Sequence, residues 1–372
     1  MSIEPPHYRI SRIANEMERS GREILHLEIG DPEVETDKRI IEAMYRAALE
    51  GATHYGPTNG IPELREKISD YMKDLANVDV DPSMISTSPG SKVAIYTALK
   101  LLNPGRIHVV EPMWGLYHSF AEEIGVEVRR ILTRYEDNWE LKRDIEDVRE
   151  GEVIAVVNPN NPTGTVLSRD SIERIVDAAS STGAYIVADE VYFDLVYRGG
   201  FTSFLEYDYE KILTIYSFSK NYAMAGFRIG WVIANSRDLI NSFIKRLRLI
   251  VGGPAPFTQY AALEALSNRD ILERNKSFYI EGLEYVSKRL KSLGFDFVEP
   301  SAGMYIFAKP PLNMDGGEFS IKLLKEKGVA VSPGTAFGDY PEFIRIVTGL
   351  KRERLARALG LIEEFIYEAR QT

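Results

Sequence analysis

Residues 184–192 read Ala-Tyr-Ile-Val-Ala-Asp-Glu-Val-Tyr, a short apolar run that is followed by two carboxylates. The apolar part, residues 184–188, has the length and composition of a buried strand. Similar runs lie on both sides of it in the sequence, at residues 107–110, 153–157, 212–216 and 230–234. Amphipathic helical spacing occurs between such runs, at residues 92–102, 168–180 and 237–249. Strands that alternate with helices predict an α/β fold whose sheet is mostly parallel and covered on both faces.

The pattern changes after about residue 274. Helical spacing over residues 277–293 is followed by a strand-like run at 304–308, a helix at 320–327 and a highly charged helix at 351–370. The chain has 372 residues, and a typical domain has roughly 100–200. We therefore expect a large domain at residues 30–275 and a smaller α+β domain at residues 276–372. The N-terminal segment 1–29 is expected to pack with the small domain.

Composition excludes several classes of function. The formal net charge of −10 argues against a nucleic-acid surface, because phosphate binding needs a basic face. The absence of cysteine excludes disulfides, thiolate metal sites and a cysteine nucleophile. The five histidines lack the paired spacing of metal motifs, so no metal site is expected; they are His7, His26, His54, His108 and His118. No apolar run approaches the roughly 20 residues of a membrane span, and no signal peptide is recognisable, so a cytoplasmic protein is expected.

Polar side chains follow the predicted strands, at the edge where parallel sheets bind ligands. Asp189 comes directly after a buried strand and should face a cation, such as a protonated pyridine nitrogen, because an unpaired buried carboxylate is unfavourable. The alternative interpretation is that Asp189 caps the next helix. Residues 158–164 read Asn-Pro-Asn-Asn-Pro-Thr-Gly, which is either an ordinary sharp turn or a turn whose asparagines bind a ligand.

Two further segments carry cations and hydroxyl groups. Residues 216–220 read Tyr-Ser-Phe-Ser-Lys, and Arg228 follows eight positions after Lys220. Alone, Lys220 would be interpreted as a surface lysine, but together these groups favour a site for a phosphate ester. Residues 88–92, Ser-Pro-Gly-Ser-Lys, lead into a predicted helix, where backbone N–H groups form a generic anion site.

In this order, the segments resemble the fold-type-I aminotransferases of class I/II, the pyridoxal-5′-phosphate-dependent family that includes aspartate aminotransferase. The likeness covers essentially the whole chain and also includes Ile29-Gly30-Asp31-Pro32, Tyr55-Gly56-Pro57, Glu111-Pro112-Met113-Trp114 and Arg345. The glycine-rich dinucleotide fingerprint is absent, which argues against a dehydrogenase. The resemblance implies a mostly parallel, seven-stranded sheet in the large cofactor domain.

The resemblance also implies a role for individual residues around the cofactor ring. Lys220 would hold pyridoxal phosphate as a Schiff base and carry the proton between Cα and C4′. Asp189 would stabilise the protonated pyridine nitrogen, and Trp114 would stack on the ring. Asn161 and Tyr192 would hydrogen-bond the phenolate oxygen and keep the Schiff-base pKa low.

Further implied roles concern the phosphate and the substrate. The phosphate would be held by Gly90, Ser91, Lys92, Ser217 and Arg228, with Tyr55 reaching the site of the neighbouring subunit in a homodimer. Arg345 would bind the α-carboxylate of the substrate through two parallel hydrogen bonds, and Gly30 would let the backbone approach the same group. Trp114 and Asn161 would border the substrate as well.

The expected reaction is a ping-pong transfer of an amino group from aspartate or an aromatic L-amino acid to a 2-oxo acid such as 2-oxoglutarate. Aspartate aminotransferase activity is the first expectation. Residues 33–37, Lys92 and Tyr117 depart from the most familiar family pattern, which leaves the subgroup open. The side-chain pocket is expected from loops at residues 13–24 and 335–338. The alternatives are a β-lyase of the same fold and a non-catalytic sensor that binds the cofactor.

Overall fold

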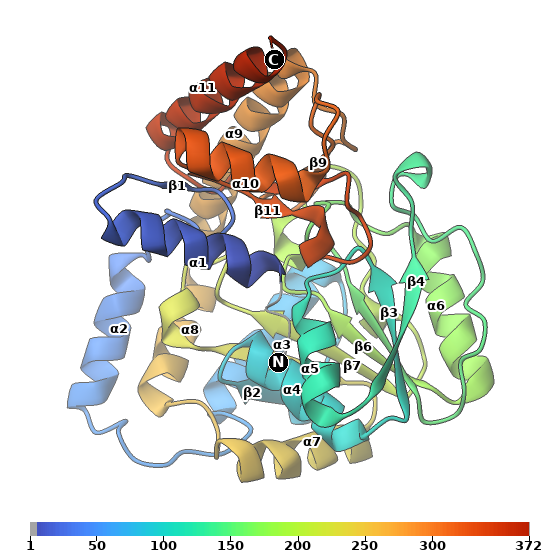
Figure 1. Ribbon diagram of the computed structural model, residues 1–372. Helices are drawn as coiled ribbons and strands as arrows, with labels where there is room; N and C mark the ends of the chain where they lie inside the picture. Colours follow the sequence, from blue (N-terminus) through green and yellow to red (C-terminus); the bar gives the residue numbers. More distant parts are fainter. Residues whose placement is uncertain (1–5, 372) are drawn as a thin grey trace.

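A seven-stranded sheet forms the centre of the computed structural model, which describes residues 6–371 (Figure 1). Its strands are β2 (Ile85–Ser88), β3 (Arg106–Glu111), β4 (Glu127–Leu132), β5 (Val153–Val157), β6 (Tyr185–Asp189), β7 (Ile212–Ser217) and β8 (Gly230–Ala234). The strand order is β2-β8-β7-β6-β5-β3-β4. Strand β8 runs opposite to the other six strands of this sheet, so the predicted α/β fold with a mostly parallel sheet is confirmed.

Helices cover both faces of this sheet because the inner strands are apolar on both sides. The side chains of Val187 and Ile215 pack in one buried cluster with α4 (Ser91–Leu102), α5 (Leu116–Ile124) and α7 (Arg237–Ile250). The side chains of Ile186 and Ala188 point to the other face, against α6 (Arg169–Thr182). Further helices pack at the β2 side of the sheet: α2 (Lys38–Leu49), α3 (Pro62–Ala76) and α8 (Pro256–Ser267).

The sequence patterns did not predict the two edge strands, β2 and β4. Three of the four residues of β2 are buried Ser and Thr, so no apolar run marks it. Strand β4 reads Glu-Val-Arg-Arg-Ile-Leu and is largely exposed. Charged residues are common on edge strands, where they discourage pairing with other chains, and they hide the strand from a search for apolar runs.

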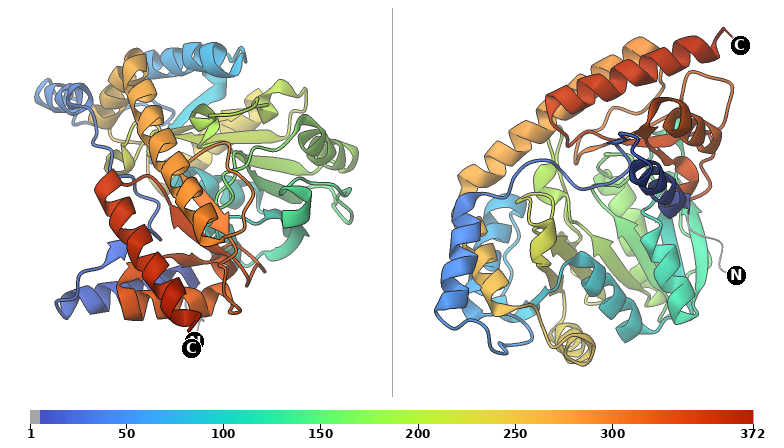
Figure 2. Two further views of the ribbon diagram at one scale, coloured as in Figure 1. Left: turned by 90° about the horizontal axis from the view of Figure 1, so that it is seen from above. Right: turned by 60° about the vertical axis from the view of Figure 1, so that its left-hand side comes forward.

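The C-terminal part builds a second, smaller layer. Its elements are α9 (Arg269–Leu293), β9 (Tyr305–Ala308), α10 (Gly316–Lys327), β10 (Val329–Ala330), β11 (Ser332–Pro333), β12 (Ile344–Val347) and α11 (Arg352–Ala369). Strands β11, β12 and β9 form an antiparallel sheet, and α9 lies beside α11 (Figure 2). The N-terminal elements α1 (Pro6–Arg19) and β1 (Leu25–His26) join this part, because β1 pairs with β10.

The helix α9 is longer than predicted and begins at Arg269 rather than at residue 277. Its buried face includes Ile271, Leu272 and Tyr279, but also the polar Asn275, which interrupts the apolar periodicity. The predicted boundary between residues 275 and 276 falls inside this helix, and the two domain ranges stay a prediction.

Short 3₁₀ turns connect several of these elements: η1 (Pro82–Met84), η2 (Tyr135–Asp137), η3 (Phe193–Leu195), η4 (Phe204–Glu206), η5 (Ala225–Phe227) and η6 (Gly334–Ala336). Within residues 6–371, none of the helices combines the length and apolar character that crossing a membrane requires.

Candidate active site

The carboxyl ends of the parallel strands meet at one edge of the large sheet, as the general rule for α/β folds predicts. Residues 189–192 follow β6, residues 217–220 follow β7, and residues 158–161 follow β5. Arg228 instead precedes its strand, β8. Because β8 is antiparallel to its neighbours, the start of β8 lies at the edge where the other strands end, and Arg228 reaches the same place.

A cavity of about 550 Å³ opens at this edge, between the large sheet and the C-terminal layer. The predicted site residues that line it are Gly30, Ser91, Lys92, Trp114, Asn161, Asp189, Tyr192, Ser217, Lys220, Arg228 and Arg345. These residues span most of the chain, so the fold brings together groups that are far apart in the sequence.

Lys220 stands in this cavity with its ammonium group next to the carbonyl oxygen of Gly30. The pKa of Lys220 is lowered to about 8, mainly by burial; Asp31 acts to raise the pKa, whereas the cations Arg345 and Arg228 act to lower it. The lowered pKa increases the neutral fraction of this lysine near neutral pH, and the neutral amine is the form that acts as a nucleophile or a general base.

Asp189 is 2% exposed and lies at the end of β6. Its carboxylate accepts hydrogen bonds from the Val191 N–H and the Tyr117 hydroxyl, both at 3.3 Å. Burial raises the pKa of Asp189 to about 7, and these two hydrogen bonds only partly offset the effect. No cation of the described residues pairs with this carboxylate, so a buried anionic group at the base of the cavity lacks a counter-charge.

Cations and hydroxyl groups gather around the start of α4. Lys92, in the first turn of the helix, lies 5.3 Å from the ring centre of Trp114, and its pKa is lowered by burial and by Arg228. The Ser217 hydroxyl donates to the hydroxyl of Ser219 at 2.9 Å. Gly90, which does not line the cavity, lies against Arg228: a Cβ atom at Gly90 would be 2.5 Å from Nη2 of the guanidinium. Because glycine has no Cβ atom, Arg228 can lie close to the start of α4.

Arg345 is held from several sides, although it is only 5% exposed. Its guanidinium donates to Oδ1 of Asn161 at 3.1 Å, to the carbonyl oxygen of Glu28 at 2.5 Å and to the Ser332 hydroxyl at 3.4 Å. The guanidinium carbon lies 4.7 Å from the ring centre of Tyr305 and 4.8 Å from that of Phe337. None of the described carboxylates forms an ion pair with it, so the cavity presents a buried guanidinium suited to a carboxylate ligand.

Comparison with known proteins identifies the family of this arrangement. The family model for aminotransferases of class I and II matches residues 22–362. The chain belongs to the class I and II aminotransferases. The aspartate aminotransferase of Thermococcus kodakarensis is 37% identical over 341 residues, which cover 91% of this chain and 87% of that protein. The (5-formylfuran-3-yl)methyl phosphate transaminase of Methanocaldococcus jannaschii is 34% identical, covering 96% of this chain and 95% of that one.

The fold of this aminotransferase also matches solved structures. The crystal structure of an aspartate aminotransferase from Thermotoga maritima superimposes with a TM-score of 0.89 at 30% identity, and the match covers 97% of each chain. The family uses pyridoxal phosphate, and the cavity fits that group in two respects. The uncompensated Asp189 carboxylate suits a protonated ring nitrogen, and the cations near α4 suit a phosphate.

Two predicted residues of the aminotransferase lie outside the cavity. Gly90 stands behind Arg228, as described above. Tyr55 is fully exposed on the surface and does not line the cavity. Its predicted role across a dimer interface involves a second subunit and stays a prediction.

The sequence patterns missed other residues of the cavity wall, above all Tyr305 and Ser11. Tyr305 is 2% exposed; its hydroxyl lies 3.0 Å from that of Tyr192, and the ring stacks on Arg345. Ser11 lines the cavity from helix α1. The loop expected at residues 13–24 is wrong in its first part, because α1 continues to Arg19. The helical spacing of Ile10 and Ala14, both buried, carried a signal for this helix. His7 lies outside the residues whose side chains are described.

Proposed function

We propose that the protein is a pyridoxal-phosphate-dependent aminotransferase that uses Lys220. The donor would be aspartate or an aromatic L-amino acid, and the acceptor a 2-oxo acid such as 2-oxoglutarate. The observation that carries the proposal is a buried carboxylate without a counter-charge, Asp189, in one cavity with a lysine of lowered pKa. When bound, the cofactor supplies an electron sink for the bond changes at the substrate Cα atom.

Each residue around the cofactor ring would then have a definite role. Lys220 Nζ would hold the cofactor and later take the proton from the substrate Cα atom and deliver it to C4′ of the cofactor. Asp189 would keep the ring nitrogen protonated, because the ion pair lowers the energy of the protonated form. Asn161 and Tyr192 would donate hydrogen bonds to the ring oxygen, and Trp114 would stack on the ring.

The two ends of the bound cofactor and substrate would be recognised by different cations. Ser91, Lys92, Ser217 and Arg228, with the backbone at Gly90, would hold the phosphate. Arg345 would bind the α-carboxylate, and the backbone at Gly30 would border it. The walls next to Arg345 are aromatic, which supports an aromatic donor.

Absorption spectroscopy tests this proposal. Purified protein with added pyridoxal phosphate should show a visible band that disappears when an accepted amino donor is added and returns with 2-oxoglutarate. Aspartate and tyrosine are tested side by side as donors. The Lys220→Ala variant is the control and should lack this cycle. A wild-type protein without any band after reconstitution would contradict the proposal.

A second assay separates transamination from elimination. The protein is incubated with a β-substituted amino acid without an oxo acid, and pyruvate and ammonia are measured. Steady release of both products would favour the β-lyase instead. A protein that binds the cofactor but converts none of the amino acids would favour the non-catalytic sensor.

We also propose a homodimer in which Tyr55 contributes to the neighbouring site. An exposed apolar surface supports it: Ile41, Tyr45 and Leu49 lie on α2, and residues 249–251 lie at the end of α7. The segment of Tyr55 is continuous with this surface, because Nε of Arg248 donates to the hydroxyl of Thr58 at 3.2 Å. Light scattering should give twice the mass of the 42.1 kDa chain. A monomer with full activity would contradict the shared site.

A further inference from the structure

Two buried polar residues connect the segments that carry the proposed catalytic groups. Asp194 lies in η3, two residues after Tyr192, and Asn221 directly follows Lys220. They are 5% and 0% exposed. The Asn221 Nδ2 group donates a hydrogen bond of 2.5 Å to Oδ2 of Asp194, although the two residues are 27 positions apart. This contact joins the segment after β6 to the segment after β7.

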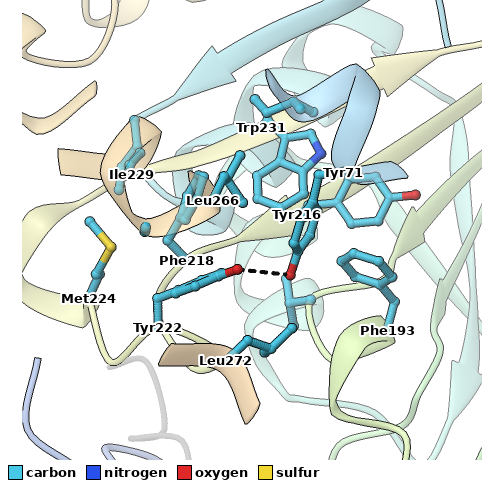
Figure 3. Close-up of a cluster of buried hydrophobic side chains, with 14 of the residues drawn as sticks. Tyr71, Phe193, Tyr216, Phe218, Tyr222, Met224, Ile229, Trp231, Leu266 and Leu272 are labelled. Atoms are coloured by element: carbon cyan, nitrogen blue, oxygen red, sulfur yellow. Dashed lines mark hydrogen bonds between the residues drawn. The ribbon is translucent and has the colours of Figure 1, made fainter. Parts of the chain in front are cut away.

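The Asp194 carboxylate has a second donor in the helix α3. The Tyr71 hydroxyl donates to the same oxygen, Oδ2, at 2.7 Å, and the Tyr222 hydroxyl donates to that of Tyr71 at 3.4 Å. Figure 3 shows the aromatic cluster in which these rings lie, with the bond from Tyr222 to Tyr71 dashed. The other oxygen, Oδ1, is buried and has no partner among the described residues.

The same stretch of backbone also accepts hydrogen bonds from α9. The Tyr279 hydroxyl donates to the carbonyl oxygen of Lys220 at 2.6 Å. The Asn275 amide donates to the carbonyl oxygen of Asn221 at 2.8 Å. Asp194 therefore does not touch Lys220 itself. It fixes the side chain of Asn221, while α9 fixes the two carbonyl groups around it.

Stability alone does not account for a carboxylate at this position. Burial raises the pKa of Asp194 to about 6, which shows that the surroundings disfavour its charge even though Asn221 and Tyr71 donate to it and Lys276 lies near. Burying a charge without an ion-pair partner is unfavourable, even where hydrogen bonds reduce the cost. The carboxylate does, however, accept from two donors of different elements at one oxygen, which defines the distance between these elements.

We infer that Asp194 is a positioning residue: through Asn221 it sets where Lys220 stands relative to Asp189 and Tyr192. The inference rests on the proposed function, since it concerns how the reactive lysine is placed. A displacement of about 1 Å in such a group can reduce a rate by roughly 100-fold. Loss of the contact should therefore affect the chemical step more than the binding of the amino donor.

The experiment compares Asp194→Ala, Asn221→Ala, the double variant and the exchanged pair Asp194→Asn with Asn221→Asp. Asp194→Ala should lower kcat by about 10- to 100-fold and change the KM for the donor by no more than about twofold. The double alanine variant should be no worse than either single one, because both remove one interaction. The exchanged pair keeps one carboxylate and one amide and should recover most of kcat.

A matched control is available in the same segment. Glu190 is also a fully buried carboxylate, but it accepts from the Phe204 N–H and from the hydroxyls of Ser203 and Tyr216, each at 2.8 Å. None of these donors belongs to Lys220 or Asn221. Glu190→Gln should change the thermal midpoint and leave kcat unchanged.

A second readout needs neither cofactor nor turnover. The rate at which an amine-reactive reagent modifies Lys220 is measured against pH in the cofactor-free protein by peptide mass spectrometry. The wild-type midpoint is expected near pH 8, from the pKa of Lys220. In Asp194→Ala the midpoint should move by about 0.5 pH unit or more, because the desolvation of the ammonium group changes. Glu190→Gln should keep the wild-type value.

The outcomes separate this inference from the proposed function. An active wild type whose Asp194→Ala variant keeps both kcat and the Lys220 midpoint would overturn the inference alone. Loss of kcat that the exchanged pair does not recover, together with an unchanged Lys220 midpoint, would also overturn it. A wild type that binds no cofactor would overturn the proposed function, and the inference with it.

Discussion

Two arginines mark opposite ends of the cavity, and their surroundings differ. Arg228 is exposed, has a left-handed backbone conformation with φ of 54°, and donates to the carbonyl oxygen of Ala225 at 2.6 Å. Arg345 is buried in a strand of the C-terminal layer and is held by three polar contacts and two rings. Arg228 shares its end of the cavity with Lys92 and several hydroxyl groups, whereas among the described residues no second cation lies beside Arg345 at the other end.

The difference predicts how each end responds to substitution. At the phosphate end, Lys92, Ser91, Ser217 and the start of α4 would compensate for the loss of one cation. At the carboxylate end, no second cation of the described residues stands beside Arg345. The following predictions test this contrast and run from the largest expected effect to the smallest.

Arg345→Gln should lower kcat/KM for every amino donor by roughly 10²–10³-fold, which corresponds to about 3–4 kcal/mol. The buried site would lose the guanidinium proposed to bind the α-carboxylate, so the main change should be a higher KM. Steady-state kinetics with two donors measures it. Equal losses in Arg345→Gln and Arg228→Gln would remove the contrast between the two ends.

Asp189→Asn should weaken cofactor binding and activity, yet stabilise the cofactor-free protein above pH 7. The pKa of Asp189 is raised from 3.8 to about 7, so the folded state holds the proton more tightly than the unfolded state. The stability from this group is present below about pH 4 and is lost as the pH rises through about 7. The difference in unfolding free energy at pH 8 should be on the order of 2–3 kcal/mol.

Urea unfolding of both cofactor-free proteins between pH 5 and 8 checks this prediction. The gain from Asp189→Asn should be larger at pH 8 than at pH 5. The same gain at both pH values would show that the carboxylate does not titrate in this range. Added cofactor should stabilise the wild type more than the variant.

Arg228→Gln should weaken the binding of pyridoxal phosphate by about 1–2 kcal/mol, roughly 10-fold, because neighbouring groups share the phosphate. Once the variant is saturated with cofactor, the KM for the amino donor should stay within about twofold of the wild type. Titration of the cofactor by absorption measures the affinity. A rise in KM comparable to that in Arg345→Gln would show that the two ends are not independent.

Tyr305→Phe should have the smallest effect, a few-fold in kcat. The ring against Arg345 remains, and only the hydroxyl that lies 3.0 Å from that of Tyr192 is removed, a contact of about 1 kcal/mol. Tyr305→Leu is the matched variant without the ring, and it should raise the KM for the donor as well. The same kcat and KM in both variants would show that the ring does not help to hold Arg345.

The strands β6 and β7, and the polar residues that follow them in the sequence, could be predicted because both signals are local. The apolar run before Asp189 marks β6, and the run before Ser217 marks β7, so the shared edge of a parallel sheet brings the two segments together. The strand β4 was missed because its charged side chains face water. The start of α9 was missed because the buried Asn275 breaks the apolar pattern.

The sequence by itself determined the fold class, the family and the order of the groups that line the cavity. Only the tertiary structure decided what surrounds each group. Tyr305 and Phe337 enclose Arg345, and Asp194 meets Asn221, through contacts between residues far apart in the chain. The physical reason is that a strand is marked by its neighbours in sequence, whereas the partner of a buried charge is chosen by the packing of distant elements.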